Sequence, residues 1–463
     1  DNGYGVERDE ARAAQLYRQS DEAGFPAGTC ALGLCYELGT GVEQDLPQAV
    51  RLYREAAEQG YVQAQCNLGF CYYRGIGVEG DDLEAAKWFA KAADAGMPRA
   101  QQLLGECFEN GFGVPKDLEK AVELYRLSHE QHFPTGTCAL GVCYEFGKGV
   151  VMDKARAAQL YREAAQQGSA WAQCNYGNCL YQGIGVEMDD EAAVQWFRKA
   201  AAQDSARASF LLGECHEYGY GVTQDFAEAV RLYQIAHQGE YPPAACSLGL
   251  CYELGRGVEM DKERAAQLYR QAAERGNARA MCNLGFFYYH GIAVPEDNDQ
   301  AVQWFTKAVQ QGYHRAEFLL GECYENGYGV EQDLTRAVEL YRMAHKGGYS
   351  GGTCSLGECY AAGRGVARDE EQAARLYLQA AQQGSARGQY LLGQCYEQGA
   401  GVARDQERAL ELYQQAADQD HEKAREALER LTAQPAAQPP APPEQPAEKP
   451  PERKRFRWPF GRK

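Results

Sequence analysis

The chain has 463 residues, of which 45% are hydrophobic and 24% charged, as in ordinary folded globular proteins. No apolar run approaches the ~18 residues that a membrane-spanning helix requires, which argues against a transmembrane protein. Asp and Glu outnumber Lys and Arg by 65 to 47, giving a net charge of −18 that disfavours nucleic acid as the main partner.

One period organises almost the whole sequence. A glycine preceded by Leu or Tyr, named here the anchor glycine, recurs every 36 residues without an insertion. The anchor glycines are Gly33, Gly69, Gly105, Gly141, Gly177, Gly213, Gly249, Gly285, Gly321, Gly357 and Gly393. A second glycine stands six residues after each anchor, and a valine and an aspartate follow at intervals of three. Self-similarity at a fixed period of this length indicates a repeat array.

Each period is predicted to contain two helices, as residues 62–97 illustrate. Ala64, Leu68 and Tyr72 lie four residues apart and form one apolar stripe. Gly75 ends this first helix, because glycine readily adopts the left-handed conformation of a helix C-cap. Asp81 suits the N-cap of the second helix, whose apolar positions recur every three or four residues. No segment is typical of a strand.

This pattern resembles the Sel-1-like repeat family, a relative of the tetratricopeptide repeats. The fifth unit carries the family positions Ala172, Tyr176, Gly177, Gly183, Gly185, Val186, Asp189, Ala193, Trp196, Phe197, Ala200 and Ala201, with Asp204 where glycine is usual. The resemblance covers residues 1–432 and implies an all-α, right-handed α-solenoid of about twelve 36-residue helix–turn–helix repeats. We expect a half repeat at 1–26, eleven full repeats and a capping helix at 421–431. Ala293 replaces a turn glycine, at a cost of ~1 kcal/mol if that position needs positive φ.

A longer period of 108 residues lies on top of the first. It relates Asn67, Asn175 and Asn283, and also Trp88, Trp196 and Trp304. We infer that the ancestral duplication unit contained three repeats.

The first helices carry a face that the repeat pattern leaves free to vary. Helical angles place the residues two before, one after and five after the anchor glycine opposite the apolar stripe, with the position four after it at the margin. The candidate binding residues there are Asn67, Phe70, Tyr73, Arg74, Asn175, Asn178, Tyr181, Gln182, Asn283, Phe286, Tyr289 and His290. The resemblance implies that this face lines the concave groove. Asparagine amides can clamp a peptide backbone, whereas the competing interpretation is that these residues pack against the next repeat.

The 17 cysteines occupy only two columns of the repeat, three residues before and two after the anchor glycine. Cys30 and Cys35, for example, are five residues apart and so do not share a helix face. No C-x-x-C pair suggests zinc or a redox centre. We expect free, buried thiols in a reducing compartment; disulfides between repeats and metal buffering are the alternatives.

No residue set indicates catalysis, a cofactor or a metal. The G-x-G-x-x-G at residues 75–80 follows a helix rather than a strand, so it is predicted to be a repeat turn. His216 stands in a column occupied elsewhere by Tyr and is expected to fill the core. Glu37, Glu145 and Glu253 recur as a carboxylate expected to be solvated at the surface. The chain is therefore predicted not to be an enzyme.

Composition changes after Thr432. Residues 433–463 are predicted to be a disordered Pro/Ala-rich linker with the basic-aromatic end ERKRFRWPFGRK. From Ala433 onward, seven Lys and Arg face three Asp and Glu. A solvated end, contact with an anionic membrane surface, a partner-binding peptide and self-contact with the acidic body are the open interpretations.

The sequence therefore predicts a protein–protein interaction scaffold or adaptor, monomeric and cytoplasmic, that binds a peptide or partner protein on the concave face. One alternative is the regulatory arm of a larger enzyme or signalling protein whose catalytic part lies upstream of residue 1. Another is a secreted host-binding effector.

Overall fold

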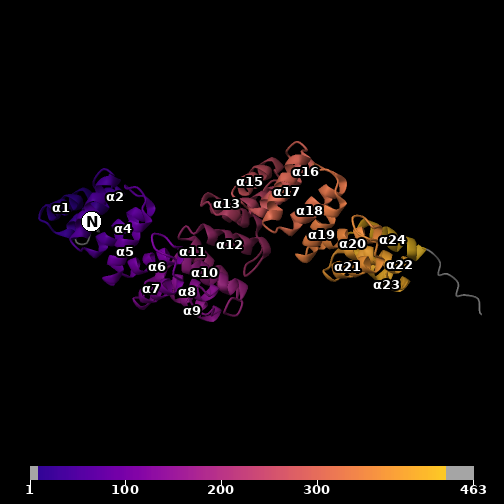
Figure 1. Cartoon of the computed structure of the whole chain (residues 1–463), viewed down its shortest axis with the longest axis horizontal. Coiled ribbons are helices and arrows are strands. Elements are labelled where there is room, and N and C mark those ends of the chain that lie inside the picture. The colour runs from indigo at the N-terminus through magenta and orange to yellow at the C-terminus, as the bar shows by residue number, and fades with distance from the viewer. Residues whose placement is uncertain (1–8, 434–463) are drawn as a thin grey trace, which may run out of the picture. The chain divides into compact units, whose positions relative to one another are not determined.

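The computed structural model of the chain describes residues 9–433, and these residues form 24 α-helices and no strand (Figure 1). The capping helix predicted at 421–431 is observed at Glu422–Ala433. Of the tail predicted for residues 433–463, only Ala433 belongs to the described residues. No helix between residues 9 and 433 is both long and apolar enough to cross a membrane.

The helices alternate between the two types that the sequence predicts. The even-numbered helices carry the anchor glycines: α2 Pro26–Leu38, α4 Val62–Arg74, α6 Pro98–Asn110, α8 Pro134–Phe146, α10 Ala170–Gln182, α12 Ala206–Tyr218, α14 Pro242–Leu254, α16 Ala278–His290, α18 His314–Asn326, α20 Ser350–Ala362 and α22 Ala386–Gln398, with α24 Glu422–Ala433 closing the series. The odd-numbered helices follow them: α1 Glu10–Glu22, α3 Leu46–Glu58, α5 Asp82–Asp94, α7 Leu118–Glu130, α9 Lys154–Gln166, α11 Asp190–Ala201, α13 Phe226–Gln238, α15 Lys262–Glu274, α17 Asn298–Gln310, α19 Leu334–Lys346, α21 Glu370–Gln382 and α23 Gln406–Ala417.

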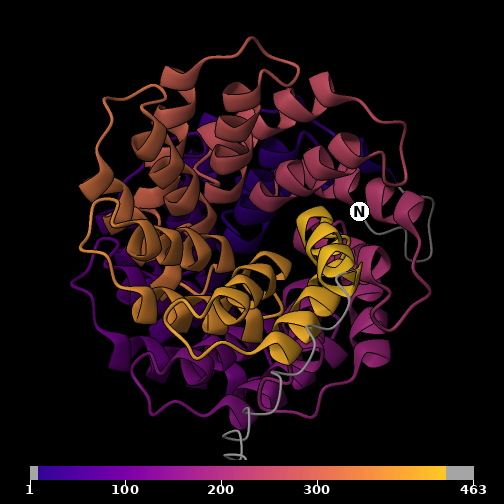
Figure 2. The ribbon, with the colours of Figure 1, turned by 90° about the vertical axis from the view of Figure 1, so that its right-hand side faces the viewer.

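The chain divides into two compact units, residues 1–280 and 281–463, with the boundary inside α16. Within each unit an even helix packs on the odd helix that follows it, and that odd helix packs on the next even one. Figure 2 shows successive helices of the second unit, coloured orange to yellow, joined by short turns. Even helices of adjacent repeats also meet directly, as α8 meets α6 and α10, and α20 meets α18 and α22. The predicted all-helical array of two-helix repeats is confirmed.

The anchor glycine has no side chain, and this leaves room for an aromatic ring of the odd helix to pack against its backbone. Tyr161 of α9 is fully buried, and a Cβ added to Gly141 of α8 would lie 2.7 Å from its ring. The same contact joins Gly177 to Phe197. Burial of one such side chain contributes about 1.5–3 kcal/mol to the free energy of unfolding. This packing contact is therefore a main source of attraction between the two helices of a repeat.

The turns follow the predicted backbone pattern. Gly75 caps α4 in the left-handed conformation, and the Asp81 carboxylate accepts hydrogen bonds from the backbone N–H groups of Leu83 and Glu84, each at 3.0 Å. Ala293 has φ +55°, so the positive φ expected of the glycine that it replaces is confirmed.

All 17 cysteines lie within the described residues; all are buried, and none of them forms a disulfide there. Burial raises the pKa of Cys66 to about 11 and that of Cys71 to about 12. These two thiols therefore stay protonated and behave as small apolar core residues.

Candidate protein-binding face

The even-helix face is defined here by the residues two before, one after and five after the anchor glycine of each even helix. Exposure increases along these three positions. In α10, Asn175 is 7% exposed, Asn178 is half-buried and Gln182 is exposed. In α16, Asn283 is buried, Phe286 half-buried and His290 exposed. In α4, Asn67 and Phe70 are half-buried and Arg74 is exposed.

The asparagine amides contact neighbouring repeats. Asn175 donates from Nδ2 to Cys138 Sγ of the preceding repeat at 3.5 Å, and its Oδ1 accepts from Arg207 of the following repeat at 2.7 Å. Asn67 repeats the contact to the preceding repeat through Cys30 Sγ, at 3.8 Å. These contacts agree with the packing interpretation for the amides, because Asn175 joins three repeats and Asn67 joins two.

A second equivalent bridge occurs in the other unit. Asn283 accepts at Oδ1 from Arg315 at 3.1 Å. The Arg315 guanidinium also lies 5.3 Å from the centre of the Phe286 ring, and Arg99 lies 5.2 Å from that of Phe70.

Three arginines contact residues of the even-helix face, and the sequence interpretation missed them. Arg99, Arg207 and Arg315 are the second residues of α6, α12 and α18, and they are 108 residues apart. The spacing that identified the asparagines was thus also a signal for the arginines. Arg99 and Arg315 extend over the residue one after the anchor glycine of the preceding repeat, whereas Arg207 bonds to Asn175.

The tyrosines at the margin of the face are half-buried and pack between a helix and a turn. Tyr181 lies 6.3 Å from the Phe197 ring of its own repeat and 5.8 Å from the Tyr220 ring of the next turn. Tyr289 makes the same pair of contacts, with Phe305 and Tyr328.

Burial raises the pKa of Tyr289 to about 12, and it also raises the pKa of Tyr181. Tyr73 of the first unit packs on Phe89 and Phe112, and its pKa is raised by burial as well. The three hydroxyls therefore remain protonated hydrogen-bond donors at neutral pH.

A cavity of about 600 Å³ opens on the even-helix face of the first unit. It brings together three of the predicted residues, Asn175, Asn178 and Gln182, and Arg207. The remaining lining residues are Val142, Glu145, Phe146, Met152, Lys154, Tyr161, Trp171 and Ile184. Phe146 is 63% exposed and Trp171 is 40% exposed, so the apolar walls are open to a ligand.

The cavity is also the place where one sequence interpretation was wrong. Glu145 was expected to be a solvated surface carboxylate, but it is partly buried and accepts a hydrogen bond from the Tyr161 hydroxyl at 2.6 Å. Glu37 and Glu253 accept the same bond from Tyr53 and Tyr269. The carboxylate is drawn inward because the buried tyrosine needs an acceptor at the end of its ring.

Glutamates occupy the position one after the anchor glycine in α6, α12 and α18. Burial, with repulsion from Glu217, raises the pKa of Glu214 to about 7 although Arg279 opposes it. Burial also raises the pKa of Glu322 to about 7; Arg387 opposes the shift, and Glu325 and Glu358 add to it. The pKa of Glu106 is raised in the same way. Glu214 and Glu322 are thus half-buried carboxylates of this face that change charge near neutral pH.

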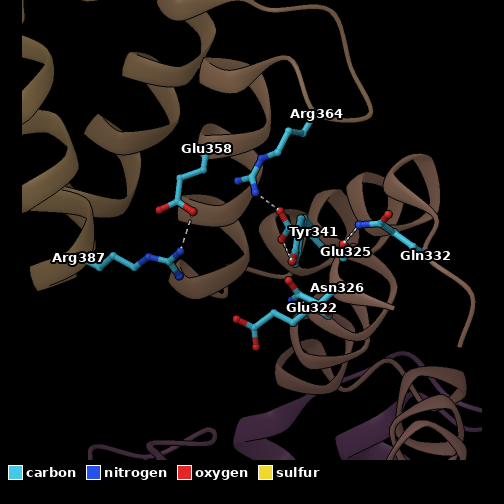
Figure 3. Close-up of polar contacts among 8 residues, drawn as sticks. All are labelled: Glu322, Glu325, Asn326, Gln332, Tyr341, Glu358, Arg364 and Arg387. Atoms are coloured by element: carbon cyan, nitrogen blue, oxygen red, sulfur yellow. Dashed lines mark hydrogen bonds and ion pairs between the residues drawn. The ribbon is translucent and has the colours of Figure 1, made fainter. Parts of the chain in front are cut away.

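Figure 3 shows the surroundings of Glu322. Arg387 donates to Glu358 at 2.9 Å, and Arg364 pairs with Glu325 at 2.6 Å. The Glu322 carboxylate extends away from the Arg364–Glu325 pair, and no contact is drawn to it.

The Sel1 repeat model matches the chain twelve times, at residues 1–25, 26–61, 62–97, 98–131, 134–169, 172–205, 206–236, 242–277, 278–313, 314–349, 352–385 and 386–421. The crystal structure of c5321, a protective antigen present in uropathogenic Escherichia coli strains, is 34% identical, with 90% of each chain covered and a TM-score of 0.67. A Sel1 repeat protein from Oxalobacter formigenes is 31% identical over 68% of this chain and 94% of its own, with a TM-score of 0.47. A search of curated proteins gave no match.

Proteins built from Sel1 repeats typically mediate protein–protein interactions, and the scaffold is generally non-catalytic. With twelve matches along its repeats, and a structural relative that aligns over nine-tenths of both chains, this chain belongs to the Sel1 repeat family.

Proposed function

We propose that the chain is a scaffold or adaptor that binds a peptide segment of a partner protein on the even-helix face. The supporting observation is the cavity beside Asn175, Asn178 and Gln182, which combines open aromatic walls with amides and two cationic side chains, Lys154 and Arg207. Exposed aromatic residues and arginine are the residue types that contribute most binding energy at protein interfaces.

The composition of the cavity favours one kind of peptide residue. Glu145 is engaged by Tyr161, whereas Lys154 and Arg207 supply positive charge at the lining. We therefore propose that the cavity binds an apolar side chain of the peptide. A neighbouring carboxylate of the same peptide would lie beside Lys154 and Arg207. Asn178 and Gln182 bind the peptide backbone, because Asn175 is already engaged on both sides.

Selection of peptides from a random library on the full chain tests this proposal. Asn178→Ala combined with Gln182→Ala is expected to weaken the selected peptides about tenfold or more, the loss of about 1.4 kcal/mol. Gln195→Ala, on the exposed side of α11, is the matched control and is expected to change nothing. Selected peptides that bind both variants equally would refute the assignment of the face.

Asn175→Ala is a poor test of partner binding, since removing its amide also breaks the bridge to Arg207. The changes at Asn178 and Gln182 avoid this difficulty because their side chains are more exposed.

The cytoplasm is the proposed location, since 17 buried free thiols suit a reducing compartment. The likeness to c5321, described as a protective antigen, supports an exported location as the competing candidate. Counting free thiols by mass spectrometry after denaturation of the native protein separates the two. If all 17 cysteines are found as free thiols, the result supports the cytoplasm. If some cysteines are found in disulfides, the result supports export.

A further inference from the structure

We infer that the basic-aromatic end of the chain, residues 452–463, docks on the even-helix face of the second unit as an intramolecular ligand. This inference stands apart from the binding proposed at the Asn175 cavity, because it involves other repeats and no external partner. It rests on a cavity, on a half-buried carboxylate and on the length of chain that follows the last described helix.

The cavity lies at the C-terminal end of the repeats. It has a volume of about 550 Å³ and is lined by Glu358, Arg387, Tyr390, Leu391, Gln394, His421, Glu422 and Lys423. The rings of Tyr390 and His421 have their centres 4.8 Å apart, and with Leu391 they form an apolar wall. A cavity of this size and composition accepts an aromatic side chain.

The cavity lining carries two carboxylates, Glu358 and Glu422, and two cations, Arg387 and Lys423, and Glu322 adds a carboxylate outside the lining. Arg387 is neutralised by Glu358, to which it donates at 2.9 Å. Glu322, in the equivalent position one repeat earlier, has no such bond, and its pKa of about 7 reflects burial that is only partly offset by Arg387. A cation placed beside Glu322 would stabilise the ionised carboxylate and lower its pKa.

The end of the chain has the complementary composition. Residues 452–463 contain Arg453, Lys454 and Arg455 next to Phe456, and Trp458 follows two residues later. Trp458 would place its indole in the cavity, and the basic residues would lie beside Glu322, so this end of the chain would satisfy both features together. This end is basic and the chain as a whole has a net charge of −18, so attraction between the two also favours the contact.

The length of the intervening chain fits this placement. The cavity includes residues 421–423 at the start of α24, and the described chain leaves at the other end of that helix. Twelve helical residues span about 18 Å, whereas the 18 proline-rich residues 434–451 can span up to about 56 Å at about 3.1 Å per residue. The basic-aromatic end can therefore reach back along α24 without extending fully.

Photo-crosslinking of the full chain tests the inference. Benzoylphenylalanine placed at position 458, at a protein concentration low enough to keep encounters between chains rare, is expected to give adducts within one chain at Tyr390, Leu391, Gln394 or His421. Glu322→Gln is expected to lower the adduct yield about threefold to fivefold, the range for loss of one partly exposed charge pair. Glu339→Gln, which removes a 51% exposed carboxylate on α19, should leave the yield unchanged.

A second variant guards against a folding effect of Glu322→Gln. Changing Arg453, Lys454 and Arg455 together to Gln alters no described residue and is expected to lower the yield at least as much. Adducts on odd helices, adducts between chains, or equal yields for Glu322→Gln and Glu339→Gln would overturn the inference. Transfer of the label to phosphatidylserine vesicles, with loss of the intrachain adducts, would instead identify a membrane surface as the preferred ligand.

Discussion

Glu214 is a carboxylate whose environment changes its protonation in the pH range of the cell. Its folded pKa of about 7 lies above the ordinary value of 4.5, chiefly because the group is buried. The folded protein therefore holds a proton that the unfolded chain releases, and the free energy of unfolding falls as pH rises from about 4.5 to 7. Below this window the Glu214 carboxyl group is protonated in both the folded and the unfolded protein, so its burial no longer lowers the free energy of unfolding.

Glu214→Gln should thus stabilise the protein at pH 8 by about 1–2 kcal/mol, a figure reduced from the full shift because solvent screens part of the interaction. At pH 4 the variant and the parent should unfold at the same urea concentration. Urea titrations followed by helical circular dichroism at both pH values provide the measurement. Glu123→Gln, on the exposed side of α7, is the control, and an equal gain from it would contradict the burial argument.

Ala293 is the residue with the clearest backbone strain among the turns. It has φ +55° at a position where other repeats have glycine. Ala293→Gly is expected to raise stability by about 1 kcal/mol, because glycine adopts positive φ without a Cβ clash.

Thermal unfolding measures the effect of Ala293→Gly. Gln195→Gly, at an exposed site in the interior of α11, should instead lower stability by about 0.5–1 kcal/mol. If both variants lower the melting temperature, the strain assigned to Ala293 is wrong.

At the scale of the helices, one aromatic residue joins the two helices of a repeat through two different contacts. The Tyr161 ring fills the space above Gly141, and its hydroxyl donates to Glu145 on the same helix as that glycine. Packing and hydrogen bonding thus fix α9 against α8 at two points along one side chain.

Tyr161→Phe keeps the ring and removes the hydrogen bond, so it should cost about 1–3 kcal/mol, the range for a bond to a charged acceptor. The double variant with Glu145→Gln should lose less than the sum of the two single changes, as expected for groups in contact. Tyr218→Phe, at a side chain that is 50% exposed, is the control for loss of a hydroxyl. Additive losses would show that the two groups do not interact.

The helices were predictable because each local signal recurs in every repeat. Glycine caps such as Gly75 and aspartate caps such as Asp81 act within a few residues of their own position, so the sequence contains them completely. The contact of Arg207 with Asn175 spans 32 residues and depends on how repeats are offset, which no local pattern gives. The burial of Glu145 was missed for the same reason, since its partner Tyr161 lies on the next helix.

The candidate face was predictable only in part. Helical angles grouped Asn175, Asn178 and Gln182 correctly at one cavity. They did not indicate that exposure increases from Asn175 to Gln182, because the neighbouring even helices cover the first of these positions and leave the last one open.

At the scale of the whole chain, the recurring contacts are between helices adjacent in sequence and between neighbouring even helices. Stability in such an array is approximately the sum of repeat and nearest-neighbour terms, so damage should spread only a short distance. A Cβ added to Gly321 would lie 2.5 Å from the Tyr341 ring, a clash that should cost about 1–3 kcal/mol.

Gly321→Ala should therefore accelerate hydrogen exchange in α18 and α19, and less strongly in α17 and α20. Exchange in α4 to α8 of the first unit should stay as in the parent protein. Mass spectrometry of peptides after exchange measures each helix separately. Uniform acceleration along the chain would show global cooperativity instead.

The burial of every thiol has a practical consequence for labelling. Alkylating reagents such as maleimides attack thiolates that they can reach, and the native fold leaves its own cysteines buried. A single cysteine engineered on an exposed loop would be the preferred attachment point for a dye or spin probe. None of the 17 natural cysteines would first have to be removed.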